Sequence, residues 1–390
     1  MNRRRFLQTT SLAALAVTLN ARTTRGESVT TGPADPPVEI AAPPLIAPVR
    51  PQLLPDPPLD VKIGQMLMIG FKQASVTPES VVAKNIRDQN VGQVVLFGNN
   101  IQSKSQLEEL THYLKSLSTY PLLLCTDQEG GLVARLTPAK GFPATLTPAD
   151  LGRKDDLAAT RAAAAEIAEN LAAVGIGLNL APVVDLAVNP RNPIVAQLKR
   201  SFSADPEIVA AQAGAFIDGH HDKGVKCTLK HFPGHGSSTG DTHAGFVDVT
   251  NTWSERELVP YRKLIEAGKV DAIMTAHIFN AKLDEDLPAT LSPKVITGLL
   301  REQLGYDGVV ISDDMQMRAI SDLYRLDRAV ELAILAGVDI IAVAGVIAYS
   351  GTVADQFFTT VNRMLEDGKI TPERIDQSYR RIMKLKNVAL

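Results

Sequence analysis

Residues 308–343 read GVVISDDMQMRAISDLYRLDRAVELAILAGVDIIAV, and this stretch holds one complete strand–helix–strand unit. Two apolar runs of strand length, 308–312 and 338–343, flank a helix-like segment at 326–336 that stops at Gly337. Near-continuous apolar runs are typical of strands that are buried on both faces of a parallel sheet. A glycine after the last helical residue is a common C-terminal cap. The stretch therefore predicts two parallel strands joined by a helix.

The same alternation recurs along the chain from about residue 60. Six further runs of strand length precede this unit, at residues 65–71, 93–97, 121–126, 177–184, 225–230 and 271–276. Helix-like segments at 157–174 and 255–267 each end at a glycine, and Thr371-Pro372 opens a last helix. Eight such units predict an α/β fold, a single (β/α)8 TIM barrel over residues 59–390. A doubly wound open sheet is the alternative, but no Gly-x-Gly-x-x-Gly follows the first strand to support a dinucleotide domain.

The composition agrees with one large folded core. Of 390 residues, 45% are hydrophobic and 21% are charged, which is ordinary for a globular protein. No apolar run of 18 residues appears, so we expect no stable membrane insertion. The formal net charge of −3 argues against a partner that is a nucleic acid. The two cysteines, Cys125 and Cys227, lie in apolar strand-like runs and are predicted to be buried free thiols.

The first 58 residues are predicted to lie outside the fold. Residues 1–26 hold five arginines and no acidic residue, and Arg3-Arg4-Arg5-Phe6 precedes a short apolar run. This combination is typical of a twin-arginine export signal and predicts an exported, periplasmic protein. Residues 27–58 contain ten prolines, and such a segment favours an extended, disordered linker over a packed core.

Polar side chains follow the predicted strands at the points where five of them end. They are Asp127, Asp185, Lys230 with His231, His277, and Asp313 with Asp314. Any one of these would ordinarily be a polar loop residue. In a barrel, however, the carboxyl ends of all strands meet at the rim where barrel enzymes hold their sites. Burying so many ionisable groups is costly unless they pair or bind something, so together they predict an active site.

The loop KHFPGHGSSTGDTH at residues 230–243 allows three interpretations. Its three histidines suggest a metal site, but no His-Glu-x-x-His or Cys/His spacing accompanies them, and no metal or cofactor is predicted. Asp241 beside His243 forms a pair in which the carboxylate fixes the imidazole tautomer and raises its basicity. That pair suits proton transfer. The third interpretation is a loop held only by its own hydrogen bonds.

These residues resemble the bacterial β-N-acetylhexosaminidases of glycoside hydrolase family 3. The most specific match is KHFPGHG at 230–236, followed after four residues by Asp241-x-His243. Further motifs match in the same order, namely DQEGG at 127–131, APVVD at 181–185, RSF at 200–202 and SDDM at 312–315. The resemblance covers about residues 60–385.

The resemblance implies a single catalytic TIM-barrel domain and a retaining mechanism. It makes Asp313 the nucleophile that forms a glycosyl-enzyme, His243 the general acid/base and Asp241 its assistant, while Asp314 is left as a structural carboxylate. It also implies five sugar-binding residues, namely Asp127, Arg135, Arg200, Lys230 and His231.

By the same resemblance, the function is that of an exo-β-N-acetylglucosaminidase, and its substrates are small carbohydrates, GlcNAc-containing cell-wall fragments or chitin-type glycosides. A phosphorylase or a β-glucosidase-like enzyme on the same scaffold is one alternative, and a non-catalytic exported sugar-binding protein is another. A binding protein needs no nucleophile, which favours an enzyme. The end of the chain at Leu390 favours the single-domain type over the two-domain β-glucosidases.

Three departures from the family pattern bear on the leaving group. Leu132 stands where these enzymes often carry arginine, and Thr242 stands where serine is usual. Residues 244–246, Ala-Gly-Phe, are more apolar than the usual continuation.

Overall fold

The computed structural model describes residues 56–345 and 351–388. The predicted export signal at 1–26 lies outside these residues, and so does nearly all of the predicted linker at 27–58. The described residues belong to the segment predicted to form the barrel, or directly precede it.

Eight parallel strands form the centre of the fold. They are β1 (Leu67–Gly70), β2 (Gln93–Leu96), β3 (Leu123–Thr126), β4 (Leu178–Asn179), β5 (Lys226–Phe232), β7 (Ala272–Thr275), β9 (Val309–Ile311) and β10 (Ile341–Val343). Their hydrogen-bonded order is β10-β1-β2-β3-β4-β5-β7-β9, and every pair in it is parallel. A further parallel bridge between Ile311 and Ile340 ties the two ends of this row together. The predicted (β/α)8 TIM barrel is therefore confirmed.

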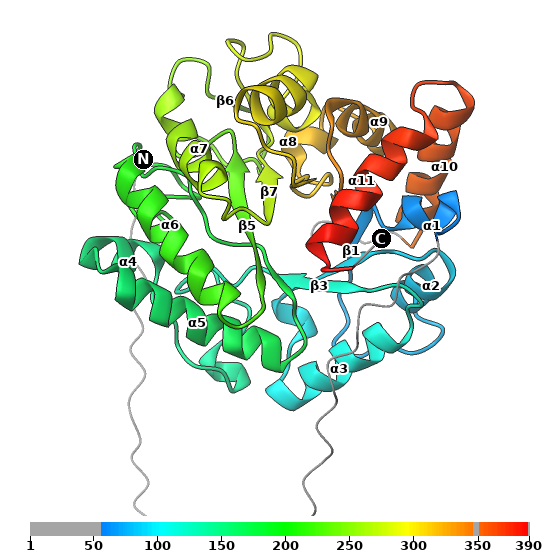
Figure 1. Ribbon diagram of the computed structural model, residues 1–390, viewed down its shortest axis with the longest axis horizontal. Coiled ribbons are helices and arrows are strands. Elements are labelled where there is room, and N and C mark those ends of the chain that lie inside the picture. The colour runs from blue at the N-terminus through cyan, green and yellow to red at the C-terminus, as the bar shows by residue number, and fades with distance from the viewer. Residues whose placement is uncertain (1–55, 346–350, 389–390) are drawn as a thin grey trace, which may run out of the picture. The chain divides into compact units, whose positions relative to one another are not determined.

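Helices follow the strands and lie around the outside of them (Figure 1). In chain order they are α2 (Val81–Asp88), α3 (Lys104–Ser116), α4 (Pro148–Lys154), α5 (Leu157–Ala173), α6 (Pro206–His221), α7 (Val259–Glu266), the π-helix η5 (Lys294–Gln303), α8 (Arg318–Ser321), α9 (Leu326–Ala336) and α10 (Val353–Glu366). Helix α1 (Leu59–Gly64) precedes β1 and packs against the last helix, α11 (Pro372–Leu385). Short 3-10 turns, η1 (Gly98–Asn100), η2 (Pro138–Lys140), η3 (Glu255–Leu258) and η4 (Ala289–Leu291), and a small pair of strands, β6 (Val247–Asp248) and β8 (Ile278–Phe279), complete the loops.

The helix boundaries follow the local signals in the sequence. Helix α9 has the predicted bounds, and Gly337 after it adopts the left-handed conformation, with φ of 109°. Helix α5 begins where the Asp156 side chain accepts a hydrogen bond from the backbone N–H of Ala159 at 3.0 Å. This cap satisfies one of the free N–H groups in the first turn.

One predicted strand is wrong in its extent. The run at 177–184 forms a strand only over Leu178–Asn179, after which a single bridge pairs Val183 with Lys230. Pro182 lies between them, and a proline has no backbone N–H to give to a ladder. The remaining backbone is held by isolated bonds, such as the one from Val184 N–H to the Lys230 carbonyl at 2.9 Å.

Apolar side chains of the strands and helices fill the interior. Cys125 on β3 and Cys227 on β5 are both buried and free, as predicted, and burial raises the pKa of each thiol. Among the described residues, no helix is both long and apolar enough to cross a membrane.

Candidate active site

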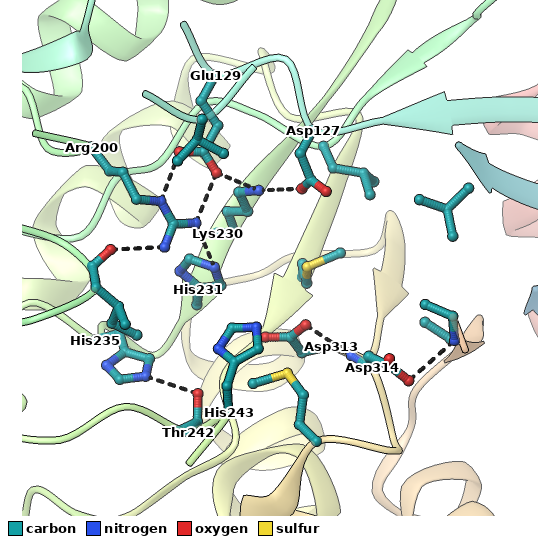
Figure 2. Close-up of a pocket in the computed structure, with 18 of the residues that line it drawn as sticks. Asp127, Glu129, Arg200, Lys230, His231, His235, Thr242, His243, Asp313 and Asp314 are labelled. Carbon is teal, nitrogen blue, oxygen red and sulfur yellow. Dashed lines mark hydrogen bonds and ion pairs between the residues drawn. The ribbon is translucent and has the colours of Figure 1, made fainter. Parts of the chain in front are cut away.

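All eight predicted site residues line one cavity of about 330 Å³ (Figure 2). Asp127 follows β3, Lys230 and His231 lie in β5, and Asp313 follows β9. These strands are parallel, so their carboxyl ends face the same rim, and the loops beyond them add the other four residues, Arg135, Arg200, Asp241 and His243. The structure thus brings together residues that are almost 190 positions apart in the chain.

Asp127 is held between two cations at the end of β3. Its Oδ1 atom accepts a hydrogen bond from Lys230 Nζ at 2.7 Å, and its Oδ2 atom accepts one from Arg135 Nη2 at 3.2 Å. Burial by itself would raise the pKa of Asp127, but the charges of Lys230 and Arg135 outweigh it and hold the pKa well below its usual range. Asp127 is therefore a charged acceptor that lines the cavity.

The Gln128 side chain returns the next loop to the cavity. Its Oε1 atom accepts hydrogen bonds from the backbone N–H groups of Arg135 at 2.8 Å and Leu136 at 2.9 Å. Its Nε2 atom donates to the Leu136 carbonyl at 3.0 Å. This clip explains how Arg135, eight residues beyond Asp127, comes back to contact it.

Glu129, two residues after Asp127, also lines the cavity and is buried. Arg200 binds it through two hydrogen bonds, from Nε to Oε2 at 2.7 Å and from Nη2 to Oε1 at 2.8 Å. Lys230 Nζ lies 2.7 Å from the same Oε1 atom. Burial opposes ionisation, but Arg200 and Lys230 outweigh it and lower the pKa of Glu129 to about 2. We call Asp127, Glu129, Arg200 and Lys230 the charged floor of the cavity.

Asp185 orients two histidines from the loop after β4. Its Oδ2 atom accepts a hydrogen bond from His231 Nδ1 at 2.7 Å, and its Oδ1 atom accepts one from the backbone N–H of His235 at 2.7 Å. The Nε2 atom of His231 is thereby left toward Arg200, whose Nη2 atom lies 3.4 Å away. Burial opposes ionisation of Asp185, but the two histidines lower its pKa to about 2.

Asp313 and Asp314 differ in their surroundings although they are neighbours. Asp313 lines the cavity, and its Oδ1 atom accepts a hydrogen bond from the Asp314 N–H at 2.8 Å. Burial opposes the charge of Asp313, but His277, His231 and His243 outweigh it and lower its pKa. Asp314 instead accepts hydrogen bonds from the backbone N–H groups of Gln316 and Ala344, both at 3.1 Å, as a structural carboxylate would.

His243 and Asp241 form the predicted pair. His243 Nδ1 lies 2.8 Å from Asp241 Oδ1, which also accepts the backbone N–H of His243 at 2.8 Å. Because a carboxylate only accepts, Nδ1 carries the proton and Nε2 is the nitrogen free to exchange one. The His243 side chain is 56% exposed, and Figure 2 shows its ring beside the Asp313 carboxylate.

Three residues that contact the predicted site residues were not assigned a catalytic or binding role from the sequence. Glu129 was part of a recognised motif, and Asp185 and His277 were recognised only as polar strand ends. His277 is fixed by Thr290 Oγ1 at 2.8 Å and by the Asp314 carbonyl at 3.0 Å. A charged residue in a Gly-rich turn after a strand was the available signal for Glu129, but its partner Arg200 lies 71 positions away.

The arrangement has the parts of a small acid–base site. A buried, ionised carboxylate and a solvent-accessible imidazole share a cavity whose wall carries paired donors and acceptors. Among residues 56–345 and 351–388, no group of three His, Cys, Asp or Glu side chains is arranged to hold a metal ion.

Comparison with known sequences identifies relatives of this chain. The family model described as Glycosyl hydrolase family 3 N terminal domain matches residues 58–385. Beta-hexosaminidase A of Pseudoalteromonas piscicida is 33% identical over 363 residues, covering 83% of this chain and 60% of that protein. A Beta-hexosaminidase of Tolumonas auensis is 39% identical over 262 residues, covering 66% of this chain and 76% of that protein.

Solved structures share the same fold. The glycoside hydrolase family 3 beta-N-acetylglucosaminidase from Paenibacillus sp. str. FPU-7 superimposes with a TM-score of 0.80 at 36% identity, over 85% of this chain and 62% of that one. Beta-N-acetylhexosaminidase from Beutenbergia cavernae gives 0.79 at 32% identity, over 85% of this chain and 99% of that one. The chain thus spans less than two thirds of the Pseudoalteromonas and Paenibacillus proteins.

Proposed function

This chain belongs to glycosyl hydrolase family 3, and from that premise we propose that it is a retaining exo-β-N-acetylglucosaminidase. The single observation that carries the proposal is the meeting of Asp313 with the Asp241–His243 pair in one cavity with the charged floor. A relative and a solved neighbour are named for hexosaminidase and β-N-acetylglucosaminidase activity. These names suggest the sugar.

Asp313 is the nucleophile in this proposal. Its lowered pKa keeps the carboxylate ionised, as attack on the anomeric carbon requires. One carboxylate oxygen forms a bond to that carbon while the bond to the leaving-group oxygen breaks. The product of this step is a glycosyl-enzyme ester on Asp313, and its hydrolysis restores the original anomeric configuration.

His243 moves the proton in both steps. In the first, the Nε2–H of the imidazolium donates to the leaving-group oxygen. In the second, neutral Nε2 accepts a proton from the attacking water, and Asp313 departs from the anomeric carbon. Asp241 accepts the Nδ1–H throughout, which keeps Nε2 directed to the reaction and stabilises the imidazolium.

The five remaining residues bind the sugar. Asp127 accepts hydrogen bonds from ring hydroxyls, and Arg135, Arg200, Lys230 and His231 donate to hydroxyls or to the acetamido oxygen. The cavity of about 330 Å³ is at the small end of ligand pockets, which favours one terminal sugar over an extended chain. This supports exo action on small cell-wall or chitin-type glycosides.

Export remains part of the proposal. The arginines and the apolar run that suggest it lie in residues 1–26, outside the described structure. Fractionation of cells that produce the full chain tests it. We expect periplasmic protein from the natural sequence and cytoplasmic protein when Arg3 and Arg4 are both changed to lysine. Periplasmic recovery of both would remove the twin-arginine assignment.

The activity is tested on a chromogenic β-GlcNAc glycoside, with Asp313→Ala alongside and with phosphate present or absent. We expect GlcNAc release that needs no phosphate and disappears in the variant. A phosphate-dependent rate with GlcNAc-1-phosphate as product would instead identify a phosphorylase, because a neutral histidine does not repel an anionic acceptor. Turnover of the matching chromogenic β-glucoside alone, assayed in parallel, would identify a β-glucosidase-like enzyme. Sugar binding without turnover of either glycoside would identify a binding protein.

A further inference from the structure

A buried carboxylic acid, Glu257, contacts the loop at 230–243 but does not line the cavity. Glu257 belongs to the short turn η3, and its residue is 1% exposed. Its Oε2 atom accepts a hydrogen bond from the backbone N–H of Gly236 at 2.9 Å. Four residues earlier, Trp253 Nε1 donates to the Pro233 carbonyl at 3.0 Å. The segment at 253–257 is therefore hydrogen-bonded to the loop at two positions, Pro233 and Gly236.

The backbone of the loop approaches Glu257 as closely as glycine permits. A Cβ atom added at Gly234, where φ is 119°, would lie 2.5 Å from the Cβ atom of Glu257. On the other side, a Cβ atom at Gly236 would lie 1.9 Å from the Leu186 carbonyl oxygen. The loop is thus packed between Glu257 and the segment after β4. A shift of the Glu257 side chain toward the loop would therefore displace the loop backbone.

The support extends from Gly236 to the proposed acid/base through one buried histidine. His235 Nδ1 lies 2.6 Å from Ser238 Oγ, and His235 Nε2 lies 3.4 Å from Thr242 Oγ1. Thr242 is buried and stands between Asp241 and His243 in the chain. Movement of the backbone at 235–236 is therefore transmitted to the Asp241–His243 pair.

Resting on the function proposed above, we propose that Glu257 is a positioning residue that must be uncharged to hold this loop, and thereby His243, in place. Among the described residues no lysine, arginine or histidine lies within ion-pair distance of Glu257. The titratable groups that act on it are Asp185 after β4 and Tyr261 on α7. Asp185 is an anion, so an ionised Glu257 meets a like charge.

The remaining polar atoms around Glu257 agree with a neutral acid. Glu257 Oε1 and the Tyr261 hydroxyl are both buried and lack a well-formed hydrogen bond to another described residue. A protonated carboxyl brings a donor to this cluster, whereas a carboxylate only accepts. Burial, with Asp185 adding to it, outweighs the hydrogen bonds from Ser237 and Gly236 and raises the pKa of Glu257 to about 7 from its usual 4.5.

The direction of the pH effect follows from that raised pKa. The stability linked to neutral Glu257 is fully present below about pH 4.5 and is lost as the pH rises through about 7. Glu257→Gln keeps an oxygen for the Gly236 N–H and cannot ionise. We expect its urea midpoint, relative to that of the wild type, to rise between pH 5 and 8, which are roughly the limits of this titration. Glu331→Gln, a buried glutamate on α9, is the matched control and should keep the wild-type slope.

Activity supplies the second readout. Glu257→Ala removes the support, so we expect kcat to fall at least about 10-fold more on glycosides with basic, alkyl leaving groups than on activated aryl glycosides, because only the former need the proton of His243. Glu257→Gln should match the wild type at pH 5.5, and the falling limb of its pH profile should lie at higher pH. A merely structural role would lower both classes of substrate equally and leave that limb unmoved.

The two arms separate this inference from the proposed function. If wild-type protein releases no GlcNAc, the function fails, while the urea series still decides whether neutral Glu257 holds the loop. If wild-type protein is active, equal pH slopes for the wild type and Glu257→Gln, or equal losses of Glu257→Ala on both leaving groups, would overturn the positioning role. If Glu257→Ala does not fold, Glu257→Gln still tests the positioning role, through the pH dependence of its urea midpoint and the falling limb of its pH–activity profile.

Discussion

The charged floor and the Asp241–His243 pair line the same cavity but are held in opposite ways. In the floor, the Lys230 and Glu129 side chains are 2% and 0% exposed, and every charge has an opposite partner within 2.7–2.8 Å. In the pair, the side chains are 56% and 34% exposed and lean mainly on each other. A site that must hold a sugar without water benefits from fixed, compensated charges. A group that must exchange protons with water needs access, and the structure gives it that access.

The largest expected effect on activity distinguishes the neighbouring residues Asp313 and Asp314. Asp313→Asn should lower kcat by about 10⁴-fold or more, because it removes the nucleophile, while leaving the urea midpoint unchanged or higher. Asp314→Ala should instead lower the urea midpoint, because the oxygen that accepts from the Gln316 and Ala344 N–H groups is lost. Steady-state rates and urea unfolding of both variants measure this. Equal losses of activity with no change in stability would show that the two roles were assigned wrongly.

The next largest effect on activity is expected when His243 of the exposed Asp241–His243 pair is removed. His243→Ala should lower kcat by roughly 10²–10⁴-fold on glycosides with basic leaving groups, the range for general acid–base catalysis. Its stability should change little, because the side chain is half exposed and its main partner is Asp241. Activated aryl glycosides serve as the control, since their leaving groups need no proton. A uniform loss over both substrates would speak against His243 as the acid.

Breaking the floor should act on stability before it acts on chemistry. Glu129→Gln leaves Arg200 and Lys230 buried with less compensation, which we expect to cost about 3–5 kcal/mol at neutral pH. The pKa of Glu129 is lowered to about 2, so its contribution is present above about pH 4.5 and lost as the pH falls through about 2. The variant should therefore be less stable than wild type at pH 7 but converge with it in acid. Asp88→Asn, which disrupts an exposed pair with Arg87, is the control and should change nothing measurable.

The same contrast explains how far the sequence could predict this molecule. Runs such as 93–97 and 326–336 carried their structure locally, through apolar burial and a glycine cap, and the eightfold alternation then predicted the barrel. Pro182 shortened one strand, because a proline has no backbone N–H to donate to the neighbouring strand. The hydrophobic pattern at 177–184 does not show this missing donor. Strand-end polar residues were found because parallel topology places them on one rim whatever their partners are.

The partners of these residues could not be predicted from the sequence. Arg200 was expected to bind sugar, yet the fold also makes it the counter-ion of Glu129, 71 positions away. Glu257 carried no signal at all, since a glutamate in the predicted helix at 255–267 is expected to be exposed, and only the fold brings the loop at 234–236 against it. Pairings of this kind depend on three-dimensional contact between loops, and no spacing in the sequence encodes them.

The smallest expected effect tests whether the exposed pair is truly independent of the floor. Asp241→Asn keeps an oxygen that can accept the Nδ1–H and the backbone N–H of His243, so the ring should stay in place. It removes the negative charge that supports the imidazolium, and we expect kcat to fall by only about 10- to 100-fold. Stability should remain at the wild-type value, because both groups are open to water and such pairs contribute little. The rate on basic leaving groups and the urea midpoint are measured together, with Glu129→Gln as the opposite case. If Asp241→Asn destabilised the protein as much as Glu129→Gln does, the pair would be part of the packed framework, and its exposure would no longer explain its chemistry.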